Sequence, residues 1–523
     1  MITLTAILWK LAIYFGLFIL AYVIYLVYKL ILSPYLVYLK YKKYSNVYTT
    51  DRFYPLIGDV KDALKDMKDG KAHYCNRIRD ADKLKDFDMR LRYEGIDPVM
   101  LILSNEATEE IIKMMPHHVD RADTKKGIYK AGKHAFIFKP STEKTMQRRK
   151  LMVSEVSFNR SSRFVPFIVQ STLDIIDNCM DESKVHEFVE ISNVLTFDAF
   201  TSILFGSDQK ELANKKYPFV MPDGSTKGMC LRDCVINSFK DHYSQLFHPL
   251  TAMARFLSDY NLCNPFKRDQ KNLDTYLNAL KKMFENAKDP NSISKRILAN
   301  SDLSHFEKLH DINAFMAAGA ETSSHGVAST IFLLKKFPEK LEKLREELKN
   351  HGVTKEYIRQ GKFSMEDLAE LDYLSYVVKE SFRYESPGPE AFVYTPKRDI
   401  TIRGVPIPKG MMIRNEIYST HYNPNYWYKP FEFAPERFDV ESSFYAEARK
   451  AGKTGPTHSR RTFGVGVRSC PGMSFATLEI KIAVAVFSVM IDWTFEGDLL
   501  TREGARFGIG SEVPCLMRIK KDY

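Results

Sequence analysis

The residues of this sequence that are best suited to chemistry lie near its C-terminal end, in the stretch "FGVGVRSCPG". Gly464 and Gly466 permit positive φ angles and let the backbone approach a flat partner closely, because neither residue carries a Cβ atom. Arg468 offers a forked pair of donors for a carboxylate. The stretch therefore predicts a loop that holds a flat, anionic group against the backbone.

The one cysteine of this stretch is its candidate metal ligand. Cys470 precedes Pro471, which is suited to the first position of a helix, and an apolar-striped helix follows. Free amides and the helix dipole favour a thiolate at such a position, and the thiolate is the form that binds metals. A lone cysteine there is usually a small buried residue. With the glycines and Arg468 beside it, Cys470 instead predicts an axial haem ligand.

The same stretch resembles the haem loop of the cytochrome P-450 family of haem-thiolate monooxygenases, written Phe-x-x-Gly-x-Arg-x-Cys-x-Gly. Every fixed place is filled, and two further places in the following helix agree; the matching residues are Phe463, Gly466, Arg468, Cys470, Gly472, Ala476 and Glu479. The resemblance implies haem b (iron protoporphyrin IX) with Cys470 as the axial thiolate. It also implies that Phe463, Gly464, Gly466, Gly472 and Arg468 contact the cofactor.

Upstream, "AAGAETSS" is similar to the family's long central helix, and it contains Glu321 and Thr322. Small residues let such a helix lie close over the haem, and a hydroxyl can break the local hydrogen-bond ladder. The resemblance implies that Glu321 and Thr322 are catalytic and relay protons to bound oxygen. An ordinary buried helix with polar residues remains the alternative for this segment by itself.

A third match is structural rather than chemical. Glu380 and Arg383 stand three residues apart, so their opposite charges lie on one helical face. The segment "PERF" places Arg437 downstream. In the family an equivalent pair is buried and joined by such an arginine. The resemblance implies that Glu380, Arg383 and Arg437 form a network that holds the haem loop and takes no part in the chemical step.

The chain departs from the family at two places that bind haem propionates. In "STEKTMQRRK", Arg149 is the expected propionate donor with Arg148 as the alternative, while Thr145 stands where most relatives have tryptophan. In "EAFVYTPKRD", Tyr394 stands where relatives often have an arginine, and Arg398 is out of register. We therefore expect fewer propionate donors than in most relatives.

The elements that must position these residues are mostly helical. Apolar residues recur every three or four positions through the middle of the chain, whereas alternating patterns are confined to "DITIRGVPIPKGMMIRNEIY" and the last thirty or so residues. We expect a mainly α fold with small antiparallel β-sheets, namely the cytochrome P-450 fold preceded by one transmembrane helix. The expected domains are an N-terminal anchor with a basic linker over 1–45 and a haem-thiolate catalytic domain over 46–523.

The anchor is the uncharged run "LAIYFGLFILAYVIYLVY", which is long enough as a helix to cross a bilayer once. A cleaved signal peptide is the alternative, but no convincing cleavage site follows the run. One lysine precedes the run, whereas several follow it in "KYKKY", so the positive-inside rule places the catalytic domain in the cytosol. We expect a single-pass protein of the endoplasmic reticulum membrane.

Composition excludes several other classes of protein. The net charge is +11 over 523 residues, and no zinc-finger, basic-zipper or RNA-binding signature is present, so we expect no nucleic-acid partner. The seven cysteines are odd in number and scattered, which indicates a reducing compartment. Cys230 and Cys234 lack a second His/Cys pair at zinc spacing, so they are better explained as small buried thiols.

The expected function is insertion of one oxygen atom of O2 into a lipophilic substrate such as a fatty acid, a sterol or a xenobiotic. Segments expected to line the cavity, around 115–138, 200–250, 391–396 and 507–512, mix apolar residues with few polar ones. The chain has no flavin or nicotinamide motif, so we expect an NADPH-dependent cytochrome P-450 reductase as partner, with cytochrome b5 as a second candidate, docking near Arg460, Arg461 and Arg468. The alternatives are a haem-thiolate isomerase or dehydratase that acts on a peroxide, and a membrane-tethered haem sensor.

Overall fold

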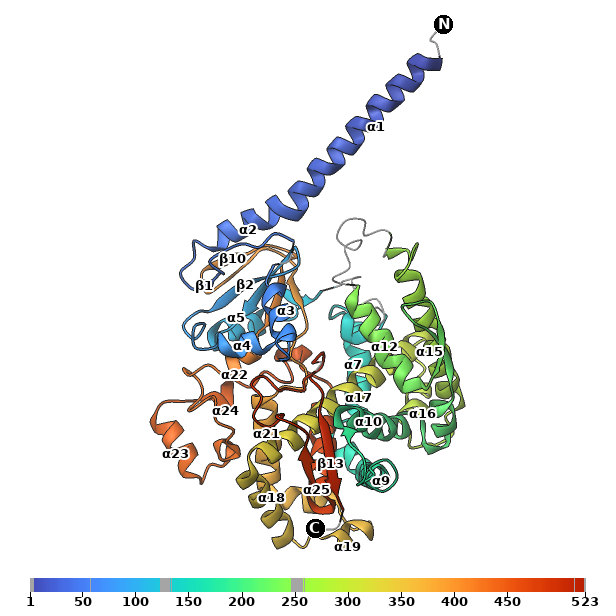
Figure 1. Cartoon of the computed structure of the whole chain (residues 1–523), viewed down its shortest axis with the longest axis vertical. Helices are drawn as coiled ribbons and strands as arrows, with labels where there is room; N and C mark the ends of the chain where they lie inside the picture. The colour runs from blue at the N-terminus through green and yellow to red at the C-terminus, as the bar shows by residue number, and fades with distance from the viewer. Residues whose placement is uncertain are drawn as a thin grey trace.

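The structure is a computed structural model that describes residues 4–56, 58–122, 132, 134–245, 257, 259–511 and 513–521. Most of the chain is helical, and the small sheets lie in separate parts of the body (Figure 1). The expected mainly α fold is confirmed. Parts of three of the segments expected to line the cavity, residues 123–131, 133, 246–250 and 512, lie outside the described residues.

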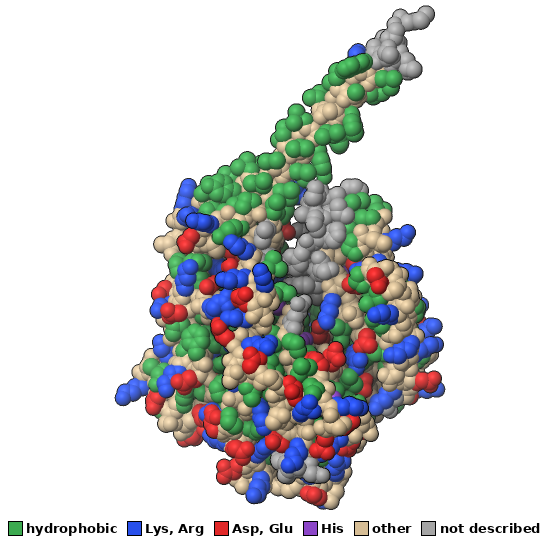
Figure 2. Space-filling view, in the orientation of Figure 1, with side chains coloured by type: hydrophobic (Ala, Val, Ile, Leu, Met, Phe, Trp, Pro, Cys, Tyr) green, Lys and Arg blue, Asp and Glu red, His purple; other side chains and the backbone are tan. Residues whose placement is uncertain are grey.

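The N-terminal helix stands apart from the body. Helix α1 (Leu4–Val27) projects away from it and continues through a π-helical turn, η1 (Tyr28–Leu32), into α2 (Ser33–Tyr41) (Figure 1). Apolar side chains cover the projecting helix, whereas charged side chains of both signs are mixed over the body (Figure 2). The expected apolar anchor helix is therefore present, and it exposes its side chains.

Two other described helices are long and apolar enough to span a membrane. They are α10 (Phe188–Phe205) and α25 (Met473–Met490), and 67% of each is buried inside the protein. Because most of their apolar surface is packed against the rest of the protein, these helices are core elements and not further membrane spans.

Helix α2 is docked on the body by tyrosine hydroxyls. Tyr38 donates to the Thr50 carbonyl at 3.0 Å, and Tyr41 donates to the Pro406 carbonyl at 2.9 Å. Both rings are buried in a cluster with the sheet residues around Met89. Part of the segment that we expected to be linker is therefore a packed helix, while a boundary near residue 45 stays a prediction.

The largest sheet has six strands in the order β1-β2-β3-β11-β8-β4. Our expectation of purely antiparallel sheets was wrong here, because the β1–β2 and β3–β11 pairs are parallel. Strands β2 and β3 are joined by a tight turn that forces antiparallel pairing, whereas β11 comes from a segment some three hundred residues later and is free to enter in either direction. The strands are β1 (Val47–Tyr48), β2 (Met89–Glu94), β3 (Asp97–Ile102), β4 (Val119–Arg121), β8 (Tyr394–Pro396) and β11 (Met412–Asn415).

The smaller sheets are antiparallel, as expected. A two-residue turn joins β9 and β10, and Arg403 and Gly404 have φ values of 49° and 78° there, as a primed hairpin turn requires. A three-stranded sheet, β12-β13-β5, closes the C-terminal end, and a separate hairpin is formed by β6 and β7. The strands are β5 (His186–Glu187), β6 (Tyr217–Val220), β7 (Thr226–Met229), β9 (Ile400–Ile402), β10 (Val405–Ile407), β12 (Asp492–Phe495) and β13 (Leu516–Lys520).

Helix α17 (His305–Lys336) is the central element of the helical core. It starts at a capping box, in which the Ser304 side chain and the Glu307 side chain each accept from the other residue's backbone N–H. Helices α10, α21 and α25 all pack on it. This long, buried helix crosses the body and fixes the face that carries Glu321 and Thr322.

The remaining helices surround this core. The α-helices are α3 (Val60–Lys68), α4 (Cys75–Arg79), α5 (Asn105–Met114), α7 (Glu143–Glu155), α8 (Phe158–Ser161), α9 (Val165–Asn178), α11 (Lys210–Asn214), α12 (Leu231–Ser244), α15 (Phe266–Asn286), α16 (Ile293–Leu298), α18 (Pro338–Asn350), α19 (Lys355–Arg359), α20 (Met365–Glu370), α21 (Asp372–Tyr384), α22 (Tyr418–His421), α23 (Ser443–Lys450) and α24 (Gly455–His458). The 3-10 turns are η2 (Phe136–Phe138), η3 (Ser162–Phe164), η4 (Ser207–Gln209), η5 (Pro435–Phe438) and η6 (Gly466–Arg468).

Candidate active site

The loop from Phe463 to Gly472 is closed by its own backbone. Gly464 and Gly466 have φ values of 70° and 66°, which residues with a Cβ rarely adopt. The Cys470 N–H donates to the Phe463 carbonyl at 2.7 Å. The two glycines therefore adopt the positive φ angles that the sequence predicted, and the loop turns so that the Cys470 N–H meets the Phe463 carbonyl. Their close approach to a flat partner stays a prediction.

Cys470 is accessible to solvent although protein surrounds it. The Cys470 residue is exposed, yet burial of the thiol raises its pKa. The Gly472 N–H and the charges of Arg149 and Arg121 act in the opposite direction and lower that pKa. A bound metal ion would add positive charge and deprotonate the thiol. Helix α25 begins at Met473 with Gly472 as its N-cap, so Pro471 lies in the turn before the helix and does not open it as we expected.

One face of α17 is accessible near the middle of the helix. Ala318 is exposed, and Glu321 and Thr322 are half-buried, in a helix whose middle is otherwise mostly buried. Gly319 points the other way: a Cβ there would lie 2.7 Å from the Phe200 ring of α10. The small residues of "AAGAETSS" therefore have two uses, since Gly319 permits close helix packing and Ala318 leaves room beside the acid and the hydroxyl.

The acid and the hydroxyl of α17 differ in their bonding. The Thr322 hydroxyl donates to the Ala318 carbonyl at 2.7 Å, one turn back, where it competes with the helix hydrogen bond. Burial raises the pKa of Glu321 to about 7, and the charge of Lys240 opposes that rise. At neutral pH Glu321 is therefore poised to release or take up a proton.

The structure separates the two arginines of α7. Arg149 reaches the loop and donates to the Ser469 carbonyl at 2.8 Å. Arg148 turns away and binds the Asp311 carboxylate, with a closest distance of 2.6 Å. Thr145, in the place of tryptophan, shares a 2.9 Å hydrogen bond with Thr142 at the start of the helix. Arg149 is thus the one of the two whose charge acts on Cys470.

Arg468 is buried, and two of its guanidinium nitrogens donate hydrogen bonds within the protein. Nη1 donates to the Lys139 carbonyl at 2.9 Å and to the Ser141 hydroxyl at 2.7 Å, and Nη2 donates to the Phe136 carbonyl at 2.9 Å. Burial lowers the pKa of Arg468 to about 10. In this arrangement Arg468 ties the loop to residues 136–141, and its binding of a propionate stays a prediction.

Arg121 is a site residue that the sequence did not indicate. Its guanidinium lies 4.0 Å from the Phe392 ring centroid and 4.7 Å from that of Tyr394, and it donates to the Arg468 carbonyl at 3.0 Å. It arrives there because β4 pairs with β8. A single arginine in a three-residue strand carries no pattern of its own. Arg398, which we considered for this role, instead pairs with His118 at 3.0 Å.

Glu380, Arg383 and Arg437 are brought together in the core. The Glu380 carboxylate accepts from Arg383 at 2.7 and 2.8 Å and lies 3.3 Å from the Arg437 Nε, and all three side chains are at most 1% exposed. The other guanidinium nitrogens donate to backbone carbonyls, which include those of Pro430 and Glu432. Such a pair is costly to break once it is buried.

This network is linked to the haem loop through His421. Its Nδ1 lies 3.1 Å from the Arg383 carbonyl, and its Nε2 accepts the Arg461 N–H at 2.8 Å. One residue further, the Thr462 hydroxyl donates to the carbonyl of Phe382 in α21 at 3.0 Å. The loop is therefore held by α21 at its start.

The residues present fit a haem. They provide a surrounded but accessible thiol, a loop with glycines where the backbone must turn, a face of α17 left open by Ala318, and the cations Arg149 and Arg121 beside the thiol. A flat cofactor with an iron ion and two carboxylates requires these features.

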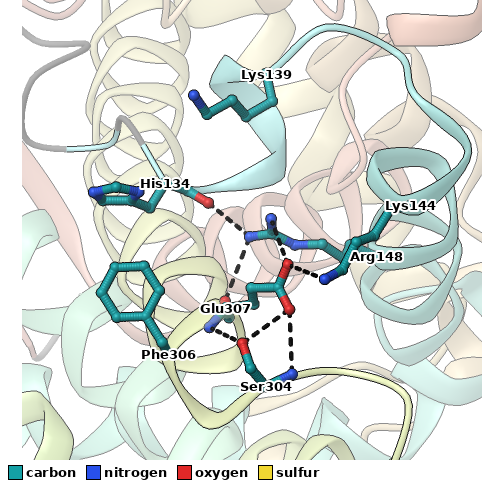
Figure 3. Close-up of a pocket in the computed structure, with 7 residues that line it drawn as sticks. All are labelled: His134, Lys139, Lys144, Arg148, Ser304, Phe306 and Glu307. Carbon is teal, nitrogen blue, oxygen red and sulfur yellow. Dashed lines mark hydrogen bonds and ion pairs between the residues drawn. The ribbon is translucent and has the colours of Figure 1, made fainter.

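A surface cavity of about 460 Å³ lies apart from this site, at the start of α17 (Figure 3). Two of its cations already have acidic partners: Lys144 is 2.8 Å from Glu307, and Arg148 binds Asp311. Acids of the protein therefore already balance these two cations. Its lining residues are His134, Lys139, Lys144, Arg148, Ser304, Phe306 and Glu307.

Comparison with known proteins agrees with this geometry. The family model described as "Cytochrome P450" matches residues 88–488. The mouse protein "Cytochrome P450 3A41" is 26% identical and covers 68% of each chain. The thale cress protein "Cytochrome P450 71B5" is 22% identical and covers 79% of this chain and 82% of its own. A "Geranylhydroquinone 3''-hydroxylase CYP76B74" of Arnebia euchroma is 32% identical over 36% of each chain.

The family model covers most of the chain, including the central helix, the Glu380 network and the haem loop. The curated relatives extend the match to chains from animals and plants. The chain therefore belongs to the cytochrome P-450 family of haem-thiolate monooxygenases.

Proposed function

We propose that this protein inserts one oxygen atom of O2 into a lipophilic substrate at the endoplasmic reticulum membrane, with haem b bound by Cys470 and electrons from a separate NADPH-dependent reductase. The observation that carries the proposal is that an accessible, protein-surrounded thiol and an acid–hydroxyl pair on α17 occur in one fold. The haem would lie between Cys470 and the Ala318 face of α17, a region that we call the cofactor space.

When bound, the haem provides oxygen activation, and the thiolate of Cys470 favours O–O cleavage by donating electron density to the iron. The protein's own contribution on this side is to position the sulfur. Gly464 and Gly466 turn the loop, and the Phe463 carbonyl fixes the Cys470 backbone. Phe463 packs edge-on against Phe382 of α21, with ring centroids 5.3 Å apart. Arg149 is the propionate donor we favour.

On the opposite side, Glu321 and Thr322 would handle protons. Cleavage of O2 consumes two protons, and a carboxyl group with a pKa near 7 transfers them efficiently at neutral pH. The Thr322 hydroxyl is adjacent, and its bond to the Ala318 carbonyl can be exchanged for one to water or oxygen. We propose Glu321 as the proton source and Thr322 as the group that passes the proton on.

The reductase partner would dock on the outer surface of the haem loop. Val467 and Met473 are exposed there, and Ile112 lies beside Gly466. Arg461 and Arg468, near which we expected docking, are buried and bonded within the protein, so neither side chain would contact the partner directly. Arg460 is exposed and remains available for an acidic partner.

The membrane assignment depends on the projecting apolar helix α1 and on the lysines that follow it. Basic residues on the cytosolic side would add attraction to anionic lipids of about 1 kcal/mol each. We propose a single-pass anchor with the catalytic domain in the cytosol.

The two alternatives are weaker. An isomerase or dehydratase that rearranges a peroxide needs no proton relay, and a haem sensor needs no open face above the cofactor. The presence of Glu321 and Thr322 beside the exposed Ala318 favours the monooxygenase over both.

The deciding experiment is a carbon monoxide difference spectrum of the reduced full-length protein, followed by turnover with a microsomal reductase. We expect the strongly red-shifted Soret band of a thiolate-ligated haem, and a product that carries one atom of isotopically labelled O2. An unshifted band in the natively folded protein would overturn the proposal, and so would a product that carries no labelled oxygen when O2, NADPH and reductase are all supplied.

A further inference from the structure

His325 is a polar residue of α17 to which the proposed mechanism gives no role. It follows Ala318 by seven residues and Glu321 by four, so the three side chains lie on one face of the helix. The positions on either side of His325 face the core instead. The Ser324 hydroxyl bonds a side chain of α10, and a Cβ atom at Gly326 would lie 2.5 Å from a side-chain carbon of α25. His325 therefore lies on the face that borders the cofactor space.

The loop before β13 holds the ring of His325 in one orientation. Nδ1 is hydrogen-bonded to the Phe507 carbonyl. That loop is itself fixed, because the Gly508 N–H donates to the Tyr74 hydroxyl at 2.8 Å. The Phe507 ring also packs edge-on against Phe332 of α17, with ring centroids 4.8 Å apart. Since a carbonyl oxygen only accepts, Nδ1 carries the ring proton.

The other ring nitrogen of His325, Nε2, is a buried acceptor without a donor. Burial lowers the pKa of His325 to about 4, so at neutral pH the ring is neutral and Nε2 keeps its lone pair. The residue is 7% exposed, and within the described part of the chain no group donates to Nε2. A buried acceptor is unfavourable unless a ligand or solvent donates to it.

We infer that Nε2 of His325 accepts a hydrogen bond from a hydroxyl group of the substrate, and that the substrate is therefore a lipophilic alcohol or phenol. The inference rests on the proposed monooxygenase function and narrows its substrate. A sterol has the required hydroxyl group, whereas an ionised fatty acid has no proton to donate. A second proton relay beside Glu321 is the competing use of His325, but a base with a pKa of about 4 is rarely protonated at neutral pH and would pass few protons.

The test compares two ligands and three variants. Dodecan-1-ol and 1-fluorododecane share one chain, and fluorine is close in size to a hydroxyl group but has no proton to donate. His325→Asn keeps an amide nitrogen near the place of Nδ1 for the Phe507 carbonyl and removes Nε2. His325→Gln instead places an amide oxygen near the position of Nε2. His351→Asn is the matched control, because the exposed His351 also has its Nδ1 bonded to a carbonyl, that of Glu347 at 2.9 Å.

Each ligand is titrated into the full-length haem-loaded protein while the type I spectral shift is recorded. Equilibrium dialysis with radiolabelled ligand gives the same dissociation constants without the haem spectrum. The ratio of the two constants is compared between proteins, so that the different hydrophobicity of the ligands cancels. We expect His325→Asn to weaken binding of the alcohol roughly five- to tenfold and to leave the fluoride unchanged. His325→Gln should keep most of the preference, and His351→Asn should keep all of it.

Three results would overturn the inference: a ratio that His325→Asn leaves at the wild-type value, a preference that His325→Gln loses as completely as His325→Asn, or no binding of the alcohol by either method. Failure of the proposed function is distinguishable, because it would remove the red-shifted carbon monoxide band, which His325→Asn should leave intact.

Discussion

The two sides of the cofactor space are built differently. On the loop side nearly every polar group is already bonded: Arg383 to Glu380, Arg468 to three partners on residues 136–141, and the Cys470 N–H to Phe463. On the α17 side, the Glu321 carboxyl forms no hydrogen bond or ion pair with described residues. The loop side is thus organised before any ligand binds, whereas the α17 side keeps polar groups for substrate, oxygen and protons.

The largest effect is expected from replacing the sulfur atom of Cys470 on the loop side. Cys470→Ser replaces the thiolate by a hydroxyl, which is a far poorer iron ligand, so we expect complete loss of the red-shifted carbon monoxide band and of turnover. Cys179→Ser is the control, because that exposed cysteine lies on another surface. Retention of the shifted band in Cys470→Ser would show that another residue binds the iron.

The next largest effect is expected from removing the Glu380 carboxylate, which supports the loop. Glu380→Gln leaves two buried guanidiniums without their carboxylate, and we expect a loss of about 3–5 kcal/mol in the free energy of unfolding, measured by urea titration. The control is Asp177→Asn, which removes an exposed partner of Arg359 and should cost at most about 1 kcal/mol. If the two variants lost equal stability, the network would not support the fold.

The contrast explains what the sequence could predict. The loop side is encoded locally: the glycines, Arg468 and Cys470 lie within one short stretch, and Glu380 and Arg383 lie within one turn of a helix. These short stretches could therefore be matched to the family's motifs in the sequence, and the mainly α fold followed from the apolar periodicity of the long helices.

The rest depends on contacts between distant segments. Arg121 reaches the loop only because β4 pairs with β8, and the charge of Lys240 acts on Glu321 only because α12 contacts α17. The parallel pairing of β3 with β11 has the same origin. The burial of Arg461 could not be predicted either, because an arginine in a basic run is normally exposed. Its partners, Asn105 and His458, are known only from the structure.

Glu479 is an exception on the loop side, where most polar groups are bonded, because no described cation pairs with its carboxyl group. It is fully buried in α25, and burial raises its pKa from 4.5 to about 8. Its contribution to folding is most favourable below pH 4.5 and is lost as the pH rises to about 8, because the unfolded state releases the proton first.

Glu479→Gln removes this titration. We expect the wild-type protein to lose on the order of a few kcal/mol of stability between pH 4.5 and 8 through this residue, and the variant to lack that part of the pH dependence. Denaturant unfolding at several pH values measures it. Identical slopes for the two proteins would mean that Glu479 is ionised in the folded state.

Thr322→Ala removes a hydroxyl group on the α17 side and leaves the loop side unchanged. We expect haem content and the carbon monoxide band to be unchanged, and the fraction of NADPH converted into product to fall several-fold with hydrogen peroxide as the by-product. Thr330→Ala is a matched control, because Thr330 donates to the Gly326 carbonyl at 2.8 Å in the same helix but is buried away from the open face. Intact coupling in Thr322→Ala would remove the hydroxyl from the relay.

The smallest expected effect concerns the outer surface of the loop. Arg460 is exposed beside buried Arg461, so only the former can meet a partner directly. Arg460→Glu should slow reduction by the reductase about two- to fivefold at low ionic strength, with less difference at high salt. Lys271→Glu, the same charge change on α15, should have no effect, and peroxide-supported turnover should be equal in both variants. A slower peroxide-supported reaction in Arg460→Glu would indicate damage to the loop, because that reaction bypasses the partner and depends only on the site that the loop holds.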